Sequence, residues 1–122
     1  MRLRRNRLRQ FHHREAIPRK DSEGSSFIDY GSAVAFMAEE WAAGGKLQVE
    51  LYGQRLPNIR NLRIDGRYSE KPGKKLQYAV EGGPVISPGD GICLYVSAES
   101  APDYKVLAIY PYNFLTLECE RL

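Results

Sequence analysis

Cysteine, histidine and long apolar runs are all scarce in this sequence of 122 residues. No run approaches the ~18 consecutive apolar residues of a transmembrane helix, so we expect no membrane span and no membrane partner. The charged N-terminal segment leads into no apolar segment, so we also expect no secretory signal. The two cysteines, Cys93 and Cys119, are too few for a disulfide framework. We expect buried, reduced thiols, with a disulfide between them as the alternative.

The residue arrangements that carry catalysis or hold a metal are also missing. His12 and His13 are the only histidines, and because they are adjacent they face opposite sides of a strand and cannot share a metal ion. Glu39 and Glu40 are adjacent, but no neighbour in the sequence would raise the pKa of one of them, as acid–base catalysis by a carboxyl pair requires. No Cys-x-x-Cys, His-Glu-x-x-His or Gly-x-Ser-x-Gly occurs. We therefore expect no catalytic residues, no cofactor and no metal, and we expect the chain not to be an enzyme.

Glycine and proline, in contrast, are frequent, with eleven and seven residues. This share lies above the average for folded proteins and indicates many turns and short elements. A chain of this length forms one domain, residues 1–122, and can bury a core without disulfide staples. Long-helix proteins, collagens, disulfide scaffolds and multidomain enzymes are excluded.

Alternating apolar residues predict that the second half of the chain is β-structure. Runs of five to seven residues with a period of two lie between glycine- and proline-containing turns, which is typical of strands, and residues 106–110 are apolar on both faces. The predicted strands are residues 76–80, 92–96, 106–110 and 115–120, and the predicted turns or loops are residues 71–75, 87–91 and 99–103. This pattern indicates a mainly β fold, a small antiparallel β-barrel or β-sandwich. We expect the last strand to lie within a sheet.

The first half of the chain is less uniform. We expect strands near residues 8–17 and 27–36, joined by a flexible polar loop at residues 18–26. Residues 33–42 have apolar side chains at helical spacing but also fit a strand that ends near Trp41. Residues 46–52 alternate strictly, as in a strand, although Leu47 and Leu51 are also one helical turn apart.

Positive charge is concentrated at the N-terminal end. Residues 1–20 carry eight basic side chains and one acidic side chain, whereas the other 102 residues have a net charge of −4. A basic end on an acidic body favours a polyanion or an acidic partner at that end, with a solvated terminus as the alternative. We expect residues 1–7 to form a flexible basic arm. The candidate docking and DNA-contact residues are Arg2, Arg4, Arg5, Arg7 and Arg9.

Aromatic residues supply a second set of candidates. Tyrosine is rigid and amphipathic and is common in protein interfaces, although it is also common in any β-sheet. Three tyrosines gather near the last predicted hairpin, and a single tryptophan precedes a basic, alternating segment. The candidate interface residues are Trp41, Arg60, Arg63, Tyr110 and Tyr112.

The order of these features carries a family resemblance. A basic start at residues 1–8 is followed by a polar loop, Tyr30-Gly31-Ser32, Glu40-Trp41-Ala42, Gly45-Lys46-Leu47-Gln48, Tyr52-Gly53-Gln54-Arg55-Leu56-Pro57, Ile59-Arg60-Asn61-Leu62-Arg63-Ile64, Gly89-Asp90-Gly91-Ile92, Tyr104-Lys105-Val106-Leu107 and a terminal alternation at residues 115–120. In this order the chain resembles the head-closure, or head–tail joining, proteins of long-tailed bacteriophages and prophages.

The resemblance implies a small β-barrel-like domain with one short helix at residues 45–54, so it favours a helix over a strand for residues 46–52. It implies a structural protein of the virion, made in the bacterial cytoplasm. Copies that are monomeric in isolation would form a ring under the portal and adaptor rings, close the DNA-filled head and present a surface to the tail or tail-terminator protein. The loop that lines the channel would be residues 18–26 or residues 65–75.

Three other functions stay open at this stage. A nucleic-acid-binding β-barrel module would need aromatic side chains on an exposed sheet face beside a basic groove. Contact of a head-closure protein with packaged DNA would be non-specific and sensitive to salt. A tail-completion protein from the same head–tail joint has similar requirements. A small hydrolase or isomerase would need a deep pocket that holds convergent polar groups.

Overall fold

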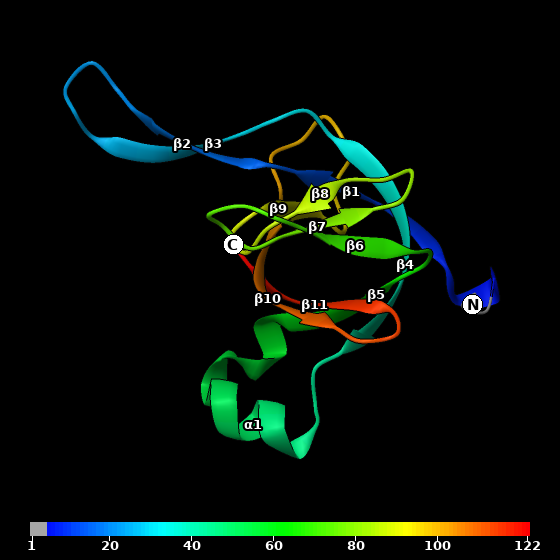
Figure 1. Ribbon diagram of the computed structural model, residues 1–122. Coiled ribbons are helices and arrows are strands. Elements are labelled where there is room, and N and C mark those ends of the chain that lie inside the picture. Colours follow the sequence, from blue (N-terminus) through cyan, green and yellow to red (C-terminus); the bar gives the residue numbers. More distant parts are fainter. Residues whose placement is uncertain (1–4) are drawn as a thin grey trace.

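A closed six-stranded antiparallel barrel forms the centre of the protein in the computed structural model, which describes residues 5–122 (Figure 1). Around the barrel the strands follow the order β1, β4, β5, β11, β10 and β9, and β9 closes the barrel by pairing with β1. Their bounds are β1 Arg9–Arg14, β4 Val34–Ala42, β5 Ile59–Ile64, β9 Gly91–Cys93, β10 Tyr104–Pro111 and β11 Leu115–Arg121. The prediction of a mainly β fold with a small antiparallel barrel and one short helix is confirmed.

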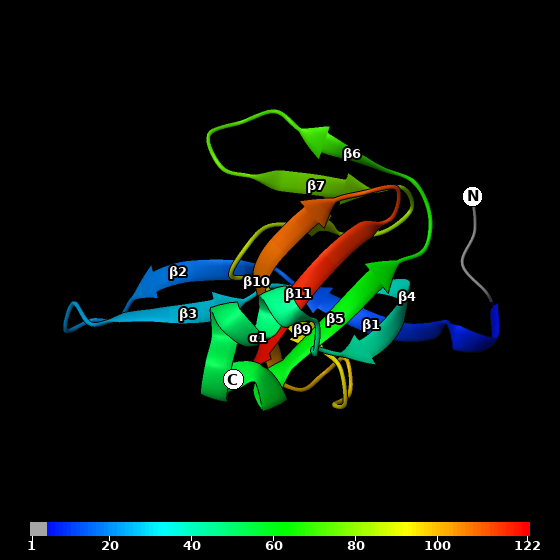
Figure 2. The ribbon, with the colours of Figure 1, turned by 90° about the horizontal axis from the view of Figure 1, so that it is seen from below.

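Three smaller units project from the barrel (Figures 1 and 2). The hairpin of β2 (Ala16–Lys20) and β3 (Ser26–Tyr30) extends away from it, and β6 (Tyr68–Lys71), β7 (Gln77–Val80) and β8 (Val85–Ile86) form a three-stranded sheet. The helix α1 (Lys46–Tyr52) and the 3₁₀ segment η2 (Gly53–Asn58) connect β4 to β5. A further 3₁₀ turn, η1 (Arg5–Arg7), precedes β1.

Alternation along the barrel strands directs one set of apolar side chains into the core. The buried residues include Phe11, Phe36, Leu62, Ile64, Ile92, Val106, Leu115 and Leu117, and the three-stranded sheet adds Tyr78, Val80 and Ile86. Cys93 and Cys119 are free and buried, as expected. Burial raises the pKa of the Cys119 thiol, so this thiol stays protonated in the core.

The structure resolves the two ambiguous segments. Residues 34–42 form the strand β4, so the helical interpretation of residues 33–42 is wrong, because the segment pairs with both β1 and β5. Residues 46–52 form the helix α1, so their strand interpretation is wrong and the helical one is confirmed. The final strand β11 lies between β5 and β10, as expected.

Four sequence predictions need correction. Residues 18–26 are not a flexible loop, because β2 and β3 pair as far as Lys20 and Ser26 and leave only residues 21–25 as the turn. Residues 65–75 are not one loop, since β6 pairs with β7 there. The strands predicted near residues 8–17 and 27–36 each divide in two, one part in the barrel and one in the hairpin.

The fourth correction concerns residues 92–96, where the strand β9 ends at Cys93. The next two backbone N–H groups, of Leu94 and Tyr95, donate to the carboxylate of Asp103 at 2.8 and 3.0 Å. Because a side chain satisfies these donors, the chain leaves the sheet without unpaired backbone groups. The turn also places the Tyr95 side chain at one end of the barrel.

Candidate interaction site

Four of the residues singled out in the sequence line one open hollow at the end of the barrel where β4 finishes and β5 begins. Arg7, Arg9, Trp41 and Arg60 surround about 620 Å³ of space, together with Asn6, Glu39, Glu40 and Tyr95. We call this the mouth hollow. Arg60 comes from the basic segment of β5, and Arg7 and Arg9 come from η1 and β1. Residues from both predicted sets therefore lie together.

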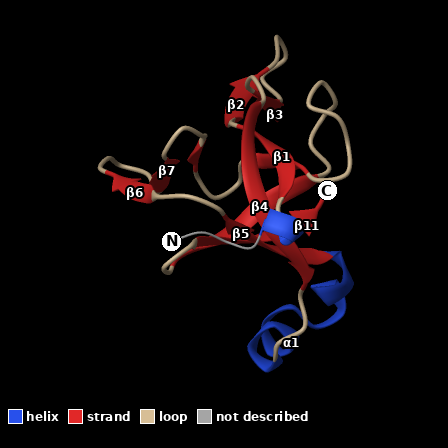
Figure 3. Ribbon diagram, turned by 90° about the vertical axis from the view of Figure 1, so that its right-hand side faces the viewer, coloured by secondary structure: helices blue, strands red, loops and turns tan. Residues whose placement is uncertain are grey.

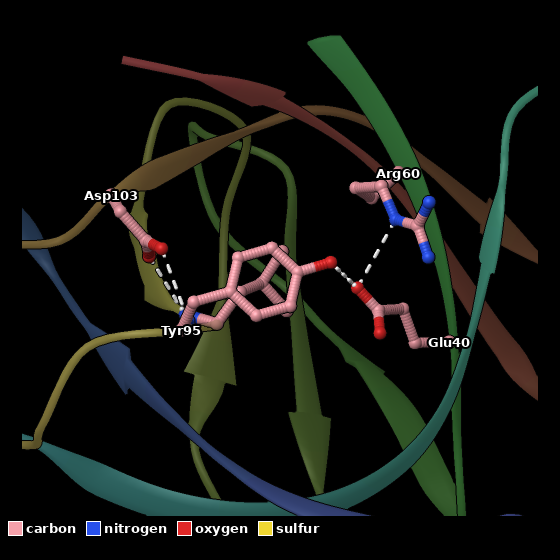
Figure 4. Close-up of polar contacts among 5 residues, drawn as sticks. Glu40, Arg60, Tyr95 and Asp103 are labelled. Carbon is pink, nitrogen blue, oxygen red and sulfur yellow. Dashed lines mark hydrogen bonds and ion pairs between the residues drawn. The ribbon is translucent and has the colours of Figure 1, made fainter. Parts of the chain in front are cut away.

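A polar cluster closes the barrel at the base of the mouth hollow (Figure 4). Arg60 Nε donates to Glu40 Oε2 at 3.1 Å, and the Tyr95 hydroxyl donates to the same oxygen. Glu40 pairs with Leu62 across β4 and β5, so its side chain is on the core side of the sheet. The Tyr95 ring packs edge-on against Tyr104, with 5.8 Å between the ring centroids. The cluster thus joins the loop after β9 to β4 and β5.

The electrostatics of this cluster indicate a structural role. Burial and the hydrogen bond to Glu40 raise the pKa of Tyr95 from 10 to about 12. The phenol therefore keeps its proton at neutral pH, and Tyr95 acts as a hydrogen-bond donor instead of a base. Glu40 is held between this donor and the Arg60 guanidinium, which neutralises its charge.

Alkaline pH will test this cluster. The folded protein holds the Tyr95 proton more tightly than the unfolded chain, so the stabilisation is complete below pH 10 and is lost as the pH rises toward about 12. We expect the free energy of unfolding to fall across this range, and to fall less steeply in Tyr95→Phe. Urea unfolding at a series of pH values measures both curves, and the values near neutral pH are the reference. Parallel curves for the two proteins would contradict the assignment.

The other predicted interface residues lie on the outer face of the barrel. The Arg63 guanidinium is 5.1 Å from the centre of the Trp41 ring, a cation–π contact that leaves both side chains half-buried. Tyr110 stacks on Tyr112 with the ring centroids 5.6 Å apart. Since Arg63 pairs with Thr116 and Thr116 pairs with Tyr110, Arg63 and Tyr110 are on the same face. The predicted interface set is therefore divided, with Arg60 facing the core side.

The predicted basic arm is only partly described. Arg2 and Arg4 lie outside the described residues. Arg5 to Arg7 form the 3₁₀ turn η1. Arg7 lies 3.6 Å from Glu39, and Arg9 is exposed on β1. With Glu39 and Glu40 in the same hollow, this end carries charges of both signs.

Sequence reasoning did not identify Glu118, which attaches α1 to the barrel. This carboxylate is 3% exposed and accepts hydrogen bonds from Gln48 Nε2 at 2.6 Å, from the Tyr52 hydroxyl at 3.1 Å and from the Tyr110 hydroxyl. Gln48 and Tyr52 are one turn apart, so the helix places its polar side against the barrel. Glu118 gave no distinct signal, because it occupies an ordinary polar position in an alternating strand.

The helix consequently exposes its apolar side chains. Leu47, Val49 and Leu51 are 70%, 48% and 59% exposed. An amphipathic helix on a globular domain usually turns its apolar side inward. This inverted arrangement leaves an uncovered apolar surface on the side of the barrel that carries α1 (Figure 3).

Sequence reasoning considered residues 18–26 only as a polar loop and a candidate to line a channel, and it did not identify the apolar side chains of the β2–β3 hairpin. Arg14 holds its base by donating to the carbonyl oxygens of Gly31 and Ser100 at 2.7 and 2.9 Å. Beyond this base the hairpin carries Phe27 and Ile28, which are 46% and 51% exposed. The hairpin is therefore anchored at its base and carries exposed apolar side chains beside the exposed Arg19–Asp29 ion pair.

Within residues 5–122, no group of three or more His, Cys, Asp and Glu side chains is placed to hold a metal ion. In the same described part of the chain, no helix is long and apolar enough to cross a membrane. Comparisons with protein-family models, with curated proteins and with solved structures found no match.

Proposed function

We propose that this protein is a structural head-closure protein of a long-tailed bacteriophage or prophage. In this role, copies form a ring under the portal and adaptor rings, close the DNA-filled head and offer a surface to the tail or tail-terminator protein. The protein would be made in the bacterial cytoplasm and become part of the virion. A short helix between the tryptophan-bearing strand β4 and the basic strand β5 agrees with the arrangement that the resemblance implies.

One observation carries the proposal: the chain leaves two different apolar surfaces uncovered on opposite sides of the barrel. One is the outer side of α1, and the other lies at the β2–β3 hairpin (Figure 1). Two unlike surfaces that bind each other make a head-to-tail contact, which closes into a ring when the rotation between copies allows it. An enzyme requires no such pair of surfaces, whereas a ring-forming protein does.

The mouth hollow provides a further surface for partners. Its arginines are suited to carboxylates and to phosphates alike, because the guanidinium group binds both in the same geometry. Glu39 and Glu40 lie beside them and neutralise part of the positive charge. This balance favours an acidic surface of the adaptor ring, with any contact to packaged DNA non-specific and sensitive to salt.

A nucleic-acid-binding module is the second candidate, because Trp41 and Arg60 adjoin the mouth hollow together with Arg7 and Arg9. Such modules stack bases on exposed aromatic rings. Here Arg63 covers a face of the Trp41 ring, which reduces the area left for a base. Salt-dependent binding of single-stranded DNA by the purified monomer would favour this candidate.

Deletion of the reading frame from an inducible prophage will test the proposal. We expect lysates with DNA-filled or leaked heads beside complete free tails, because heads would lack the surface that receives the tail. Electron microscopy distinguishes these particles, and adding the purified protein should restore joined virions. The control is the same deletion supplied with the intact gene in trans.

Other outcomes have equally definite meanings. Normal virions in the deletion strain would refute an assembly function and move the nucleic-acid module to first place. Closed heads beside over-long or unfinished tails would assign the protein to the tail side of the joint, as a tail-completion protein.

A further inference from the structure

We propose that α1 of one copy docks in the groove beside the β2–β3 hairpin of the next copy. This inference rests on the proposed ring assembly and identifies the two surfaces that meet. The occupant of the groove is therefore a second copy of this chain, bound head to tail.

The groove lies between the hairpin, the loop that joins β6 to β7, and the turn after β8. Pro18, Ile28, Leu76 and Pro88 give it apolar walls, and it encloses about 670 Å³. In Figure 2 the hairpin and the β6–β7 loop extend on the same side of the barrel. Because neither element packs over the other, their apolar side chains stay accessible, with Leu76 43% exposed.

Two lysines, Lys75 and Lys105, are also among the residues that line the groove. Lys75 is exposed and makes no ion pair within the described part of the chain, and Lys105 is half-buried. Asp90 also lines the groove, but its carboxylate is occupied by His13 and by the backbone N–H groups of Ala16 and Ser87. An apolar groove of this kind fits an apolar segment that carries a negative charge.

The outer side of α1 has these properties. Leu47 and Leu51 are one turn apart and Glu50 is three residues after Leu47, so the three side chains form one patch on the helix surface. All three are exposed, and Glu50 makes no hydrogen bond or ion pair with the described residues. The leucines match the apolar walls of the groove, and Glu50 matches Lys75 and Lys105.

The positions of the two surfaces also agree with contact between copies. The hairpin and α1 lie on opposite sides of the barrel (Figure 3), so a chain cannot fill its own groove with its own helix. A helix in the groove of the next copy would cover both apolar surfaces at once.

Disulfide trapping tests the contact. We would prepare Leu47→Cys and Leu76→Cys, which place thiols on the helix and on the groove wall, and oxidise them alone and mixed at millimolar concentration. Both positions are exposed, so folding should be unaffected, and the native cysteines are buried. Met37→Cys, on exposed Met37 of β4, is the matched control. We expect a disulfide dimer in the mixture and a ladder of oligomers from the double variant.

The contact is overturned if Leu47→Cys forms disulfides only with itself, which would indicate a symmetric helix–helix dimer. It is also overturned if no variant yields more disulfide dimer than Met37→Cys does. A second measurement adds Leu51→Ser to the Leu47→Cys chain, which should lower the yield of the mixed disulfide dimer at millimolar concentration by roughly tenfold or more, because a leucine no longer leaves water on docking. An unchanged yield would also overturn the inference.

These results separate the contact from the proposed function. If gene deletion produces free heads and tails but disulfide trapping yields no ladder of oligomers, the head-closure function is supported and this contact is rejected. A ladder together with normal virions would retain head-to-tail association and reject head closure.

Discussion

Glu118→Ala is expected to lower the free energy of unfolding by about 3 kcal/mol and to release α1 from the barrel. The substitution removes the acceptor of three side-chain hydrogen bonds, from Gln48, Tyr52 and Tyr110. Hydrogen bonds to a charged group contribute about 1.5–3 kcal/mol each. These three share one carboxylate, so their contributions to the free energy of unfolding are not additive. The loss is limited because a released helix exposes its donors to water.

Urea unfolding measures the change in stability, and limited proteolysis of residues 43–58 reports the release of the helix. Glu120→Ala is the matched control on the same strand. Glu120 accepts two hydrogen bonds of 2.7 Å from Arg55 of η2, but the Arg55 side chain is 54% exposed, so we expect Glu120→Ala to cause a clearly smaller loss than Glu118→Ala. Equal losses in the two variants would show that Glu118 does not hold the helix.

Asp90→Ala should have an even larger effect, about 3–5 kcal/mol, because it removes a buried carboxylate that accepts three hydrogen bonds and leaves their donors unpaired. Asp90 is 2% exposed and accepts hydrogen bonds from His13 at 2.7 Å, from the Ser87 backbone at 2.9 Å and from the Ala16 backbone at 3.0 Å. It thus joins β1, the start of β2 and the turn after β8. A loss of this size is a large part of the 5–15 kcal/mol that stabilises a typical domain.

Thermal and urea unfolding will measure this loss, with Asp90→Asn as a graded variant that keeps one acceptor oxygen and should retain part of the stability. Asp29→Ala is the control, since Asp29 is an exposed partner of Arg19 in the hairpin and should change stability far less than Asp90→Ala does. If Asp90→Ala unfolds no more readily than Asp29→Ala, the buried cluster does not anchor the hairpin base.

The sequence alone determined the fold class, because the period-two alternation of strands is a local property of the chain. Residues 106–110 and 115–120 fall within β10 and β11, and the fold class of a small antiparallel barrel is confirmed. The sequence also identified Trp41, Arg60, Arg7 and Arg9, which the structure brings to one hollow. Their residue types attracted attention, but no pattern indicated that they would meet.

Tertiary structure alone decided the roles of Asp90 and Glu118. Asp90 stands in a Gly-Asp-Gly turn, and its partner His13 is 77 residues away along the chain. Glu118 is an ordinary polar residue in an alternating strand, and it receives Gln48 from 70 residues away. Local sequence patterns carry no information about contacts at such separations, because the barrel must close before these groups become neighbours.

The orientation of α1 has the same explanation. A helix of seven residues is too short to be stable alone, so its packing decides which side faces inward. Apolar alternation in residues 46–52 suggested a strand and the resemblance favoured a helix, but a helix assignment alone would place the leucines against the core. The buried carboxylate of Glu118 instead attracts Gln48 and Tyr52, because an unpaired buried charge costs more than exposed leucines do. This preference, which arises only in the folded barrel, leaves Leu47 and Leu51 on the surface.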